Sequence, residues 1–440
     1  MIYYLLFIII VLFLIVLLID KDIFSPSAII CESYILSICC AIINKDVWNL
    51  TMSKKTMYLL LLGISMFIIV SELIVHIKLK NTIKTKNSEK TFNKIEINKT
   101  YYRIFVIIQI ITIFVYFSYV LKVVGGISSF SNFSNLMNYY RENTSYGELD
   151  TGIPTIVNQF VKISKILAYF SSYIFIVNRS IDKKNGKKDK ENNFLYCVSI
   201  VSYGILSLLS GGRFDLIAFC ISSIVTWKIV SDIISENKGL NNIKNVMKIL
   251  VVTLIIMIAF SNLRNIVGRT NKEGLVEYIS KYFGGSIQLL DLYMENPTMN
   301  KDVLGKETFY GINRTLSKFG LVKNYKMHLE FRAKNGIVIG NVYTSFRNFY
   351  SDFGIYGVII LQIILSIFWS LYYKKIKRKN DLKKFDINLV IYCMYINTLF
   401  LHSFRDSFFS TVITISTITT IIYLLIVKKI IIKEVKTNDT

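Results

Sequence analysis

The stretch IYYLLFIIIVLFLIVLLI (2–19) contains no charged side chain. A helix of about 18 or more apolar residues is long enough to cross the roughly 30 Å hydrocarbon core of a membrane. The stretch therefore predicts a membrane-spanning helix. No positive side chain precedes it and no A-x-A cleavage site follows it, so we expect a retained first helix rather than a cleaved signal peptide.

Similar apolar runs recur along the chain, in which 53% of the residues are hydrophobic and 18% are charged. This pattern predicts an all-α, polytopic bundle of about eleven (10–12) membrane-spanning helices. The short alternating segments of a β-barrel are absent from the sequence. The expected spans are 2–19, 27–44, 57–77, 102–124, 155–177, 194–210, 214–232, 248–266, 353–373, 387–403 and 409–428.

We expect one integral membrane domain over 1–440, with eight spans in 1–266 and three spans and a cytoplasmic tail in 353–440. The segment 267–352 between them is predicted to be a large external loop. Connectors that long are usually functional or disordered, and the mixed charge, many aromatic residues and single proline of this one argue against disorder. Within it, LVEYISKYF (275–283) has helical spacing, and Gly284-Gly285 is expected to end that helix. The helix is suited equally to the membrane interface and to packing on the bundle.

The formal net charge is +23, from 52 Lys+Arg against 29 Asp+Glu. Lysines concentrate in short connectors, which the positive-inside rule explains without a nucleic-acid partner. Alternation then assigns every other connector to the outside. The cytoplasmic segments are 78–99, 178–192, 373–384 and the tail, and the external segments are 125–154, 211–213, 267–352 and 404–408.

Cysteine and histidine provide no recognisable metal or disulfide pattern. The six cysteines lie in apolar segments without a C-x-x-C motif, and His76, His328 and His402 are scattered. No metal site is therefore expected. The sequence also lacks a Walker loop and a G-x-G-x-x-G motif, so no nucleotide and no other cofactor is predicted.

Arginines gather in the external segments, where topology does not call for positive charge. Their planar guanidinium groups bind phosphate oxygens bidentately. Together they indicate a site for an anionic, phosphate-bearing ligand, although any single arginine has the simpler interpretation of an interfacial side chain. The set comprises Arg141, Arg213, Arg264, Arg269, Arg314, Arg332, Arg347 and Arg405.

The turn SGGRFDLIAF (210–219) places Arg213 behind two glycines. Gly211 and Gly212 can adopt positive φ and let backbone N–H groups approach a ligand. The following helix N-terminus also favours an anion. Asp215 is predicted either to cap that helix or to orient Arg213, and a plain helical hairpin turn is the alternative.

The stretch NVYTSFRNFYSDFGIYG (341–357) predicts a polar helix face, and Arg347 and Tyr343 lie on the adjacent face. Asp352 is the candidate general base, and its alternative role is an N-cap. The polar face comprises Asn341, Ser345, Asn348 and Asp352. A second short turn, LHSFRDSFF (401–409), holds His402, Arg405 and Asp406, and His402 is predicted to be either a base or a structural histidine.

The chain resembles the oligosaccharide repeat-unit polymerases of the Wzy type, which build O-antigens and capsules. Four stretches carry the resemblance, in order and spacing: 210–219, EYISKYFGGSIQLLD (277–291), GKETFYGINR (305–314) and 341–357. One departure is that some members have ten residues between an arginine and a glycine, whereas only nine residues separate Arg264 from Gly274.

The resemblance implies a membrane glycosyltransferase of the GT-C type in the bacterial cytoplasmic membrane. Its substrates are oligosaccharide units on polyprenyl pyrophosphate, joined on the external face into O-antigen, capsular or exopolysaccharide without metal or nucleotide. Membrane lipid, a chain-length regulator and a flippase are the expected partners. An O-antigen ligase and a flippase of lipid-linked units are the alternative functions.

The site expected from these residues has three catalytic members, Asp352, His402 and Arg347. The group expected to bind pyrophosphate and substrate comprises Arg213, Arg264, Arg269, Arg314, Arg405, Gly211, Gly212, Asn341 and Tyr343.

Overall fold

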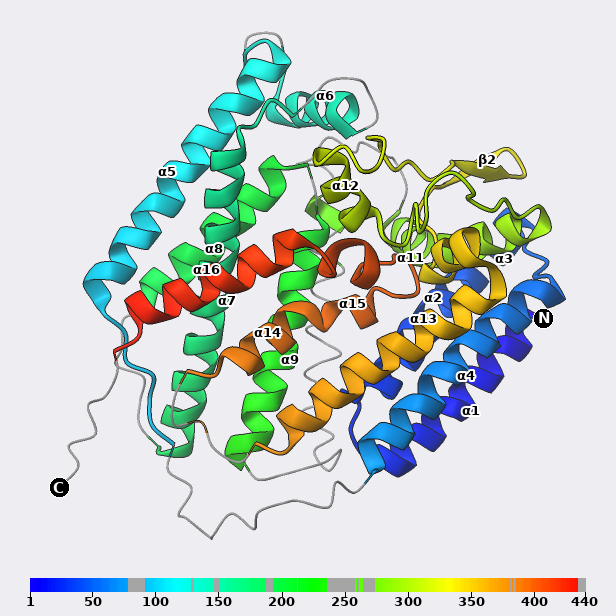
Figure 1. Cartoon of the computed structure of the whole chain (residues 1–440), viewed down its shortest axis with the longest axis horizontal. Coiled ribbons are helices and arrows are strands. Elements are labelled where there is room, and N and C mark those ends of the chain that lie inside the picture. The colour runs from blue at the N-terminus through cyan, green and yellow to red at the C-terminus, as the bar shows by residue number, and fades with distance from the viewer. Residues whose placement is uncertain are drawn as a thin grey trace.

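The computed structural model describes residues 1–77, 92–127, 130–145, 151–186, 193–211, 213–235, 258, 261–263, 274–379, 382 and 385–433. These residues form a bundle of helices with one small β-hairpin (Figure 1). In this part of the chain, seven helices are long and apolar enough to cross a membrane. The chain is therefore a mostly helical, multi-pass membrane protein.

The first elements are α1 (Ile2–Asp20), α2 (Pro26–Ile43), α3 (Lys45–Trp48), α4 (Lys54–His76), α5 (Lys99–Val124), α6 (Phe133–Ser145), α7 (Thr155–Lys184), α8 (Phe194–Leu209) and α9 (Phe214–Ser235). The later elements are α11 (Leu275–Glu295), α12 (Tyr310–Lys318), β1 (Arg332–Lys334), β2 (Ile337–Gly340), α13 (Ser345–Lys377), α14 (Ile387–Tyr395), α15 (Asn397–Phe400), the π-helix η2 (Phe408–Val412) and α16 (Ile415–Ile431). Each predicted span contains helix, and nearly all of 248–266 lies outside the described residues.

The last two predicted spans are less regular than expected. The segment 387–403 is divided into α14 and α15, because the Asn397 amide donates to the Met394 carbonyl at 2.6 Å and competes with the helix pattern. The segment 409–428 begins with η2, and its α-helix starts only after Thr414. The Thr414 hydroxyl caps that helix by accepting from the Thr417 amide.

The two ends of the bundle differ in composition. The last turns of α7, α13 and α16 each carry lysines, and we call this end the lysine end. The opposite end, upper in Figure 1, carries α6, α12 and the β-hairpin, and we call it the loop end. The predicted separation of charge along the chain is therefore also a separation in space.

α11 lies across the loop end and is one continuous helix. Its first turns reach the α8–α9 turn, where Tyr278 contacts Arg213, and its far end reaches the start of α4, where Asp291 accepts from the Ser53 amide at 2.9 Å. The expected break at Gly284-Gly285 is wrong. Residues 283–294 are buried against the bundle.

Gly284 explains why α11 continues through this point. A Cβ there would lie 2.4 Å from the Ala41 backbone nitrogen and 2.5 Å from the Cys40 carbonyl carbon, both on α2. The missing side chain lets the backbones of α2 and α11 touch. A glycine also permits close packing between α4 and α13, where a Cβ on Gly63 would lie 2.4 Å from the Phe346 ring.

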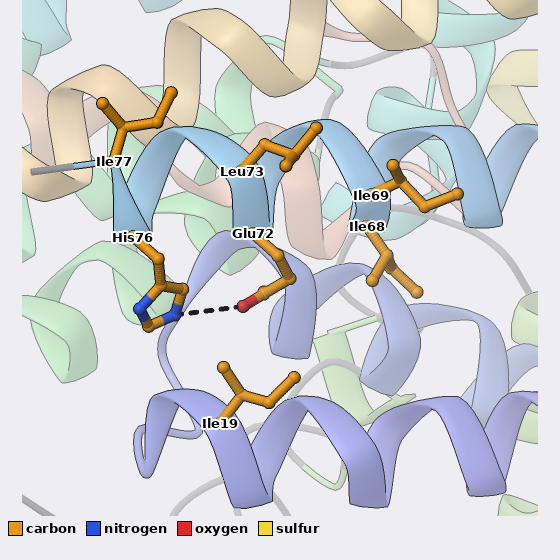
Figure 2. Close-up of a pocket in the computed structure, with 7 residues that line it drawn as sticks. All are labelled: Ile19, Ile68, Ile69, Glu72, Leu73, His76 and Ile77. Carbon is orange, nitrogen blue, oxygen red and sulfur yellow. Dashed lines mark ion pairs between the residues drawn. The ribbon is translucent and has the colours of Figure 1, made fainter.

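α1 lies on the outside of the bundle, and only 22% of its apolar 18-residue stretch is buried inside the protein. Its C-terminal end faces the end of α4, from which Glu72 and His76 project toward it (Figure 2). The exposed remainder of α1 is apolar, so lipid is its natural surrounding.

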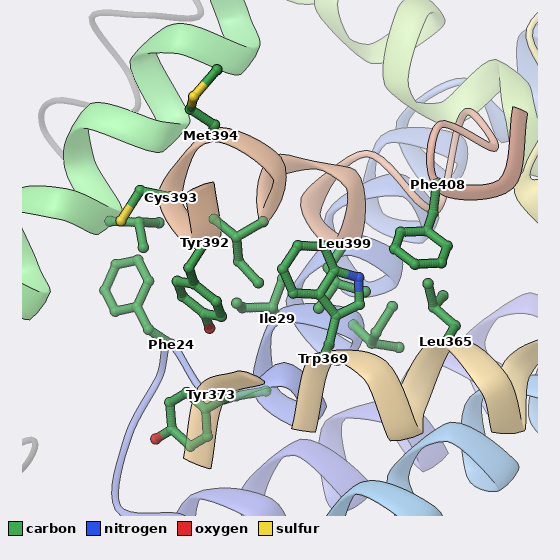
Figure 3. Close-up of a cluster of buried hydrophobic side chains, with 14 of the residues drawn as sticks. Phe24, Ile29, Leu365, Trp369, Tyr373, Tyr392, Cys393, Met394, Leu399 and Phe408 are labelled. Atoms are coloured by element: carbon green, nitrogen blue, oxygen red, sulfur yellow. The ribbon is translucent and has the colours of Figure 1, made fainter. Parts of the chain in front are cut away.

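The largest buried cluster centres on Trp369 of α13 (Figure 3). Its ring lies 5.7 Å from that of Tyr392 on α14 and 5.9 Å from that of Phe408 on η2. Trp369 is fully buried. The cluster therefore holds the short, irregular α14, α15 and η2 against the long α13, and with them the turn that carries His402 and Arg405.

We expect Gly284→Ala to lower stability by about 1–3 kcal/mol, because the added Cβ overpacks the α2–α11 contact and no flexible side chain can move aside. Gly204→Ala is the control, since its Cβ would meet Leu216 Cδ2 at an ordinary 3.6 Å. Thermal unfolding in detergent measures both variants. Equal melting temperatures would contradict the close approach of α2 and α11.

Candidate functional site

The turn between α8 and α9 brings Arg213 to the loop end. Gly211 has φ 74°, as predicted, and Gly212 lies outside the described residues. A Cβ on Gly211 would lie 3.4 Å from Arg141 Cβ, so this turn touches α6. Arg213 itself is only 3% exposed and points into the protein.

The Arg213 guanidinium lies against aromatic side chains of α11. Its Nη2 donates to the Tyr278 hydroxyl at 2.6 Å, and its Cζ lies 5.7 Å and 5.9 Å from the ring centroids of Tyr278 and Tyr282. Aromatic faces attract cations through their quadrupole, and guanidinium stays charged in dry surroundings. The turn and α11 therefore hold a buried cation at the loop end.

Arg405 approaches the same aromatic side chains from the turn after α15. It is exposed, and its Cζ lies 5.3 Å from the Phe214 ring centroid. Phe214 in turn contacts the rings of Tyr282 and Phe404 at 6.1 Å and 6.0 Å. We call this group the Arg213 site, and it comprises Arg213, Phe214, Tyr278, Tyr282, Phe404 and Arg405.

No described hydrogen bond joins Asp215 to Arg213. The Asp215 side chain is half-exposed and pairs with a lysine. Its Oδ1 lies 3.1 Å from Nζ of Lys165 on α7. Lys162, one turn earlier, donates to the Thr419 hydroxyl on α16 at 3.3 Å. Neither lysine was among the residues predicted for the site, although ionisable residues inside an apolar span are themselves a signal of function.

Arg347 is the centre of a second group, the Arg347 network. It forms ion pairs with Glu307 and, at 2.7 Å, with Glu330, and its side chain is only 3% exposed. Its Cζ also lies 4.9 Å and 5.1 Å from the Tyr293 and Tyr343 rings. Two carboxylates therefore already compensate this guanidinium, so its contacts are those of a residue that fixes the long loop to α13.

Asp352 lies next to this network and is bound by backbone groups. Its two oxygens accept from the Thr308 amide at 2.7 Å, the Glu307 amide at 3.0 Å and the Asn300 side chain at 2.9 Å. It does not cap the span that follows. That span begins after Gly354, whose φ of 64° and ψ of −154° bend α13. Asp352 thus holds the loop preceding α12 in place through these hydrogen bonds.

The expected polar face over 341–352 is only partly correct. α13 begins at Ser345, so Asn341 lies in the preceding loop, where its amide is 3.5 Å from the Leu329 carbonyl. Tyr343 also precedes the helix, and its hydroxyl donates to the Glu330 carbonyl at 3.0 Å. The conformation changes here because Thr344 is the N-cap residue, in extended geometry.

His402 is buried and has partners at both ring nitrogens. The Tyr34 hydroxyl lies 2.9 Å from Nδ1 and the Gln362 amide nitrogen lies 2.7 Å from Nε2. Its backbone carbonyl accepts from Ser345 of α13. These contacts join α2, α13 and the 401–404 turn, which is a structural arrangement, and a substrate would have to displace one of them.

Asp406 follows Arg405 and has a different environment. Its Oδ1 accepts from the Phe409 amide at 3.3 Å, whereas Oδ2 is buried without a hydrogen-bond partner among the described residues. Burial raises the pKa of Asp406 to about 7, against the opposing effect of the Phe409 amide and the Arg405 charge. Such a carboxyl group exchanges protons near neutrality.

The remaining predicted arginines do not converge on the Arg213 site. Arg264 and Arg269 lie outside the described residues. Arg314 is exposed on α12. Arg332 joins the Arg347 network, since its Nη2 lies 3.1 Å from Glu330. The described arginines of this set therefore form at least two groups, of which the Arg213 site combines an exposed guanidinium with aromatic faces.

Comparison of the chain with known protein families, curated proteins and solved structures finds no match.

We expect Arg347→Ala to lower stability by about 3–5 kcal/mol, because it leaves the Glu307 carboxylate, only 10% exposed, without its cation. Arg314→Ala, at an exposed position on α12, should change stability little. Thermal unfolding of the two purified variants separates these outcomes. A wild-type melting temperature for Arg347→Ala would contradict the structural role of the network.

Proposed function

We propose that the chain is a membrane glycosyltransferase that polymerises oligosaccharide repeat units carried on polyprenyl pyrophosphate. The observation that carries this proposal is the Arg213 site, where two guanidinium groups lie on one aromatic cluster at the loop end. Arginines suit the pyrophosphate, and flat aromatic faces suit sugar rings and the prenyl chain.

The proposed setting is the bacterial cytoplasmic membrane, with about eleven spans that include 248–266. Positive charge favours the cytoplasmic side, so we assign the lysine end to the cytoplasm and the loop end to the external face. A donor that carries its own pyrophosphate leaving group needs no nucleotide at that face. The absence of nucleotide-binding motifs from the sequence agrees with this assignment.

The proposed reaction forms one glycosidic bond and breaks one glycosyl–phosphate bond. An acceptor hydroxyl oxygen attacks the anomeric carbon of the growing chain, and the bond from that carbon to the pyrophosphate oxygen breaks with inversion. Arg213 and Arg405 stabilise the negative charge that develops on the departing pyrophosphate. No proton donor to this leaving group is needed, because its charge is compensated by the arginines.

We propose that Asp406 is the general base that takes the proton from the acceptor hydroxyl. Its Oδ2 lacks a donor among the described residues and it is adjacent to Arg405 in the chain. Asp352 and His402 already have their acceptor positions engaged.

The direct test is an assay with the purified full chain and lipid-linked repeat units extracted from source cells that lack this chain. A polymerase makes products longer than one repeat without added nucleotide. A ligase would instead move single units to a surface acceptor, and a flippase would relocate them unchanged in length. Folded protein that yields no product above one repeat would overturn the proposal.

The pH profile of this assay tests Asp406. A general base acts when deprotonated, so with a pKa of about 7 the rate should rise as the pH increases from 6 to 8. Asp406→Asn should lower the rate by about 10²- to 10⁴-fold and remove that rise. Asp302→Asn, whose side chain is 80% exposed, is the control. An unchanged profile in Asp406→Asn would exclude Asp406 as the base.

A further inference from the structure

A cluster of three potential metal ligands lies at the lysine end, far along the bundle from the Arg213 site. His76 and Glu72 project from the last turns of α4, and Asp20 is the last residue of α1. His76 Nε2 lies 3.0 Å from Asp20 Oδ1 and 3.3 Å from Glu72 Oε2. All three ligand atoms lie within 4.8 Å of one another.

The carboxylates in this cluster are buried and incompletely satisfied. The Asp20 side chain is 1% exposed and the Glu72 side chain is 16% exposed. Asp20 Oδ2 and Glu72 Oε1 have no hydrogen-bond partner among the described residues, and Glu72 Oε2 meets the His76 ring nitrogen at 3.3 Å. Buried carboxylate oxygens without partners are costly, so the site requires a cation or further donors.

Within the described residues, the positive charge at this cluster does not balance the two carboxylates. A protonated His76 supplies one charge against two. The nearby Lys374 ammonium donates to the carbonyls of Ile74 and Ile77, at 2.6 Å each, rather than to a carboxylate. A divalent cation with neutral His76 brings the group to zero net charge.

The shape of the surroundings suits an ion with an open position. The cluster opens on a cavity of about 620 Å³ whose walls are otherwise apolar, lined by Ile19, Ile68, Ile69, Leu73 and Ile77 (Figure 2). Figure 2 shows the His76 ring and the Glu72 carboxylate side by side on this cavity. His76 is 48% exposed, so water can reach the fourth coordination position.

We propose that Asp20, Glu72 and His76 bind one divalent transition-metal ion of the zinc class. Zinc binds imidazole nitrogen and carboxylate oxygen at about 2.0–2.2 Å, so tetrahedral ligand atoms lie roughly 3.3 Å apart, close to the two His76 distances. The imidazole favours zinc over magnesium and calcium, which prefer oxygen ligands alone. The ion joins the lipid-facing α1 to α4.

No metal site was expected from the sequence, because the histidines are scattered along the chain. The fold brings His76 beside Asp20, and Glu72 shares its helix face at a spacing of i,i+4. The E-x-x-x-H spacing in SELIVH (71–76) was the signal available, and its third ligand comes from another helix.

Metal titration of the untagged, chelator-treated full chain in detergent tests this proposal. Co²⁺ serves as a visible-absorption probe, and we expect one Co²⁺ per chain that Zn²⁺ displaces. Zn²⁺ should also raise the melting temperature of the wild-type chain. Glu72→Gln, which keeps the side-chain shape, and His76→Ala, at a half-exposed position, should each weaken binding at least 100-fold and abolish the thermal shift.

His328→Ala is the matched control, because it removes another exposed histidine far from the cluster and should leave the titration unchanged. Folded wild-type protein that binds no stoichiometric Co²⁺ or Zn²⁺ would overturn the proposal. Equal affinity in wild type, Glu72→Gln and His76→Ala would overturn it as well, since the metal would then sit elsewhere, for example on a cysteine.

Discussion

The apolar surroundings of the long helices determine where charge can lie in this protein. A charged side chain within a hydrocarbon layer costs roughly 2.5–3.5 kcal/mol even on lenient insertion scales, so charged groups collect at helix ends or form pairs. Both outcomes occur here. Lysines terminate α7, α13 and α16 at one end, and arginines with aromatic partners occupy the other.

This constraint separates the arginines into two chemical situations. Arg347 is neutralised by Glu307 and Glu330 and fixes the long loop on α13. Arg213 and Arg405 lie on aromatic rings, which lower the cost of burying a cation. We assign Arg347 a structural role, since a guanidinium held by two carboxylates has little remaining attraction for pyrophosphate.

Close helix packing connects these groups. α11 crosses the loop end and contributes Tyr278 and Tyr282 to the Arg213 site and Tyr293 to the Arg347 network. It reaches these positions only because Gly284 lets it rest on the backbone of α2. The glycine that resembled a helix stop in the sequence is therefore the residue that permits the helix to continue.

The sequence predicted the helices well, because an apolar run of membrane length has few alternative structures in water or lipid. It predicted the positive φ of Gly211 for a similarly local reason. Long-range partners were not accessible to it. The pairing of Arg347 with Glu307 and Glu330, and of His76 with Asp20, depends on how distant segments pack.

Two local signals were present but were not used. Lys162 and Lys165 interrupt an apolar span, which marks them as functional candidates. Asn335-Gly336 is a residue pair that two-residue hairpin turns favour, and the structure has the β1–β2 hairpin turn there, with positive φ at both residues. The role of Asp352 in holding backbone amides at 307 and 308 had no such local signal.

The central claim is that the Arg213 site binds the pyrophosphate of a lipid carrier. Direct binding of undecaprenyl pyrophosphate to the purified chain, measured by native mass spectrometry beside undecaprenyl monophosphate, tests it without any knowledge of the sugars. The account predicts one tightly bound pyrophosphate lipid, preferred over the monophosphate, and at least a 100-fold loss of affinity in the Arg213→Ala, Arg405→Ala double variant. Equal affinity in the double variant and the wild type would contradict the account.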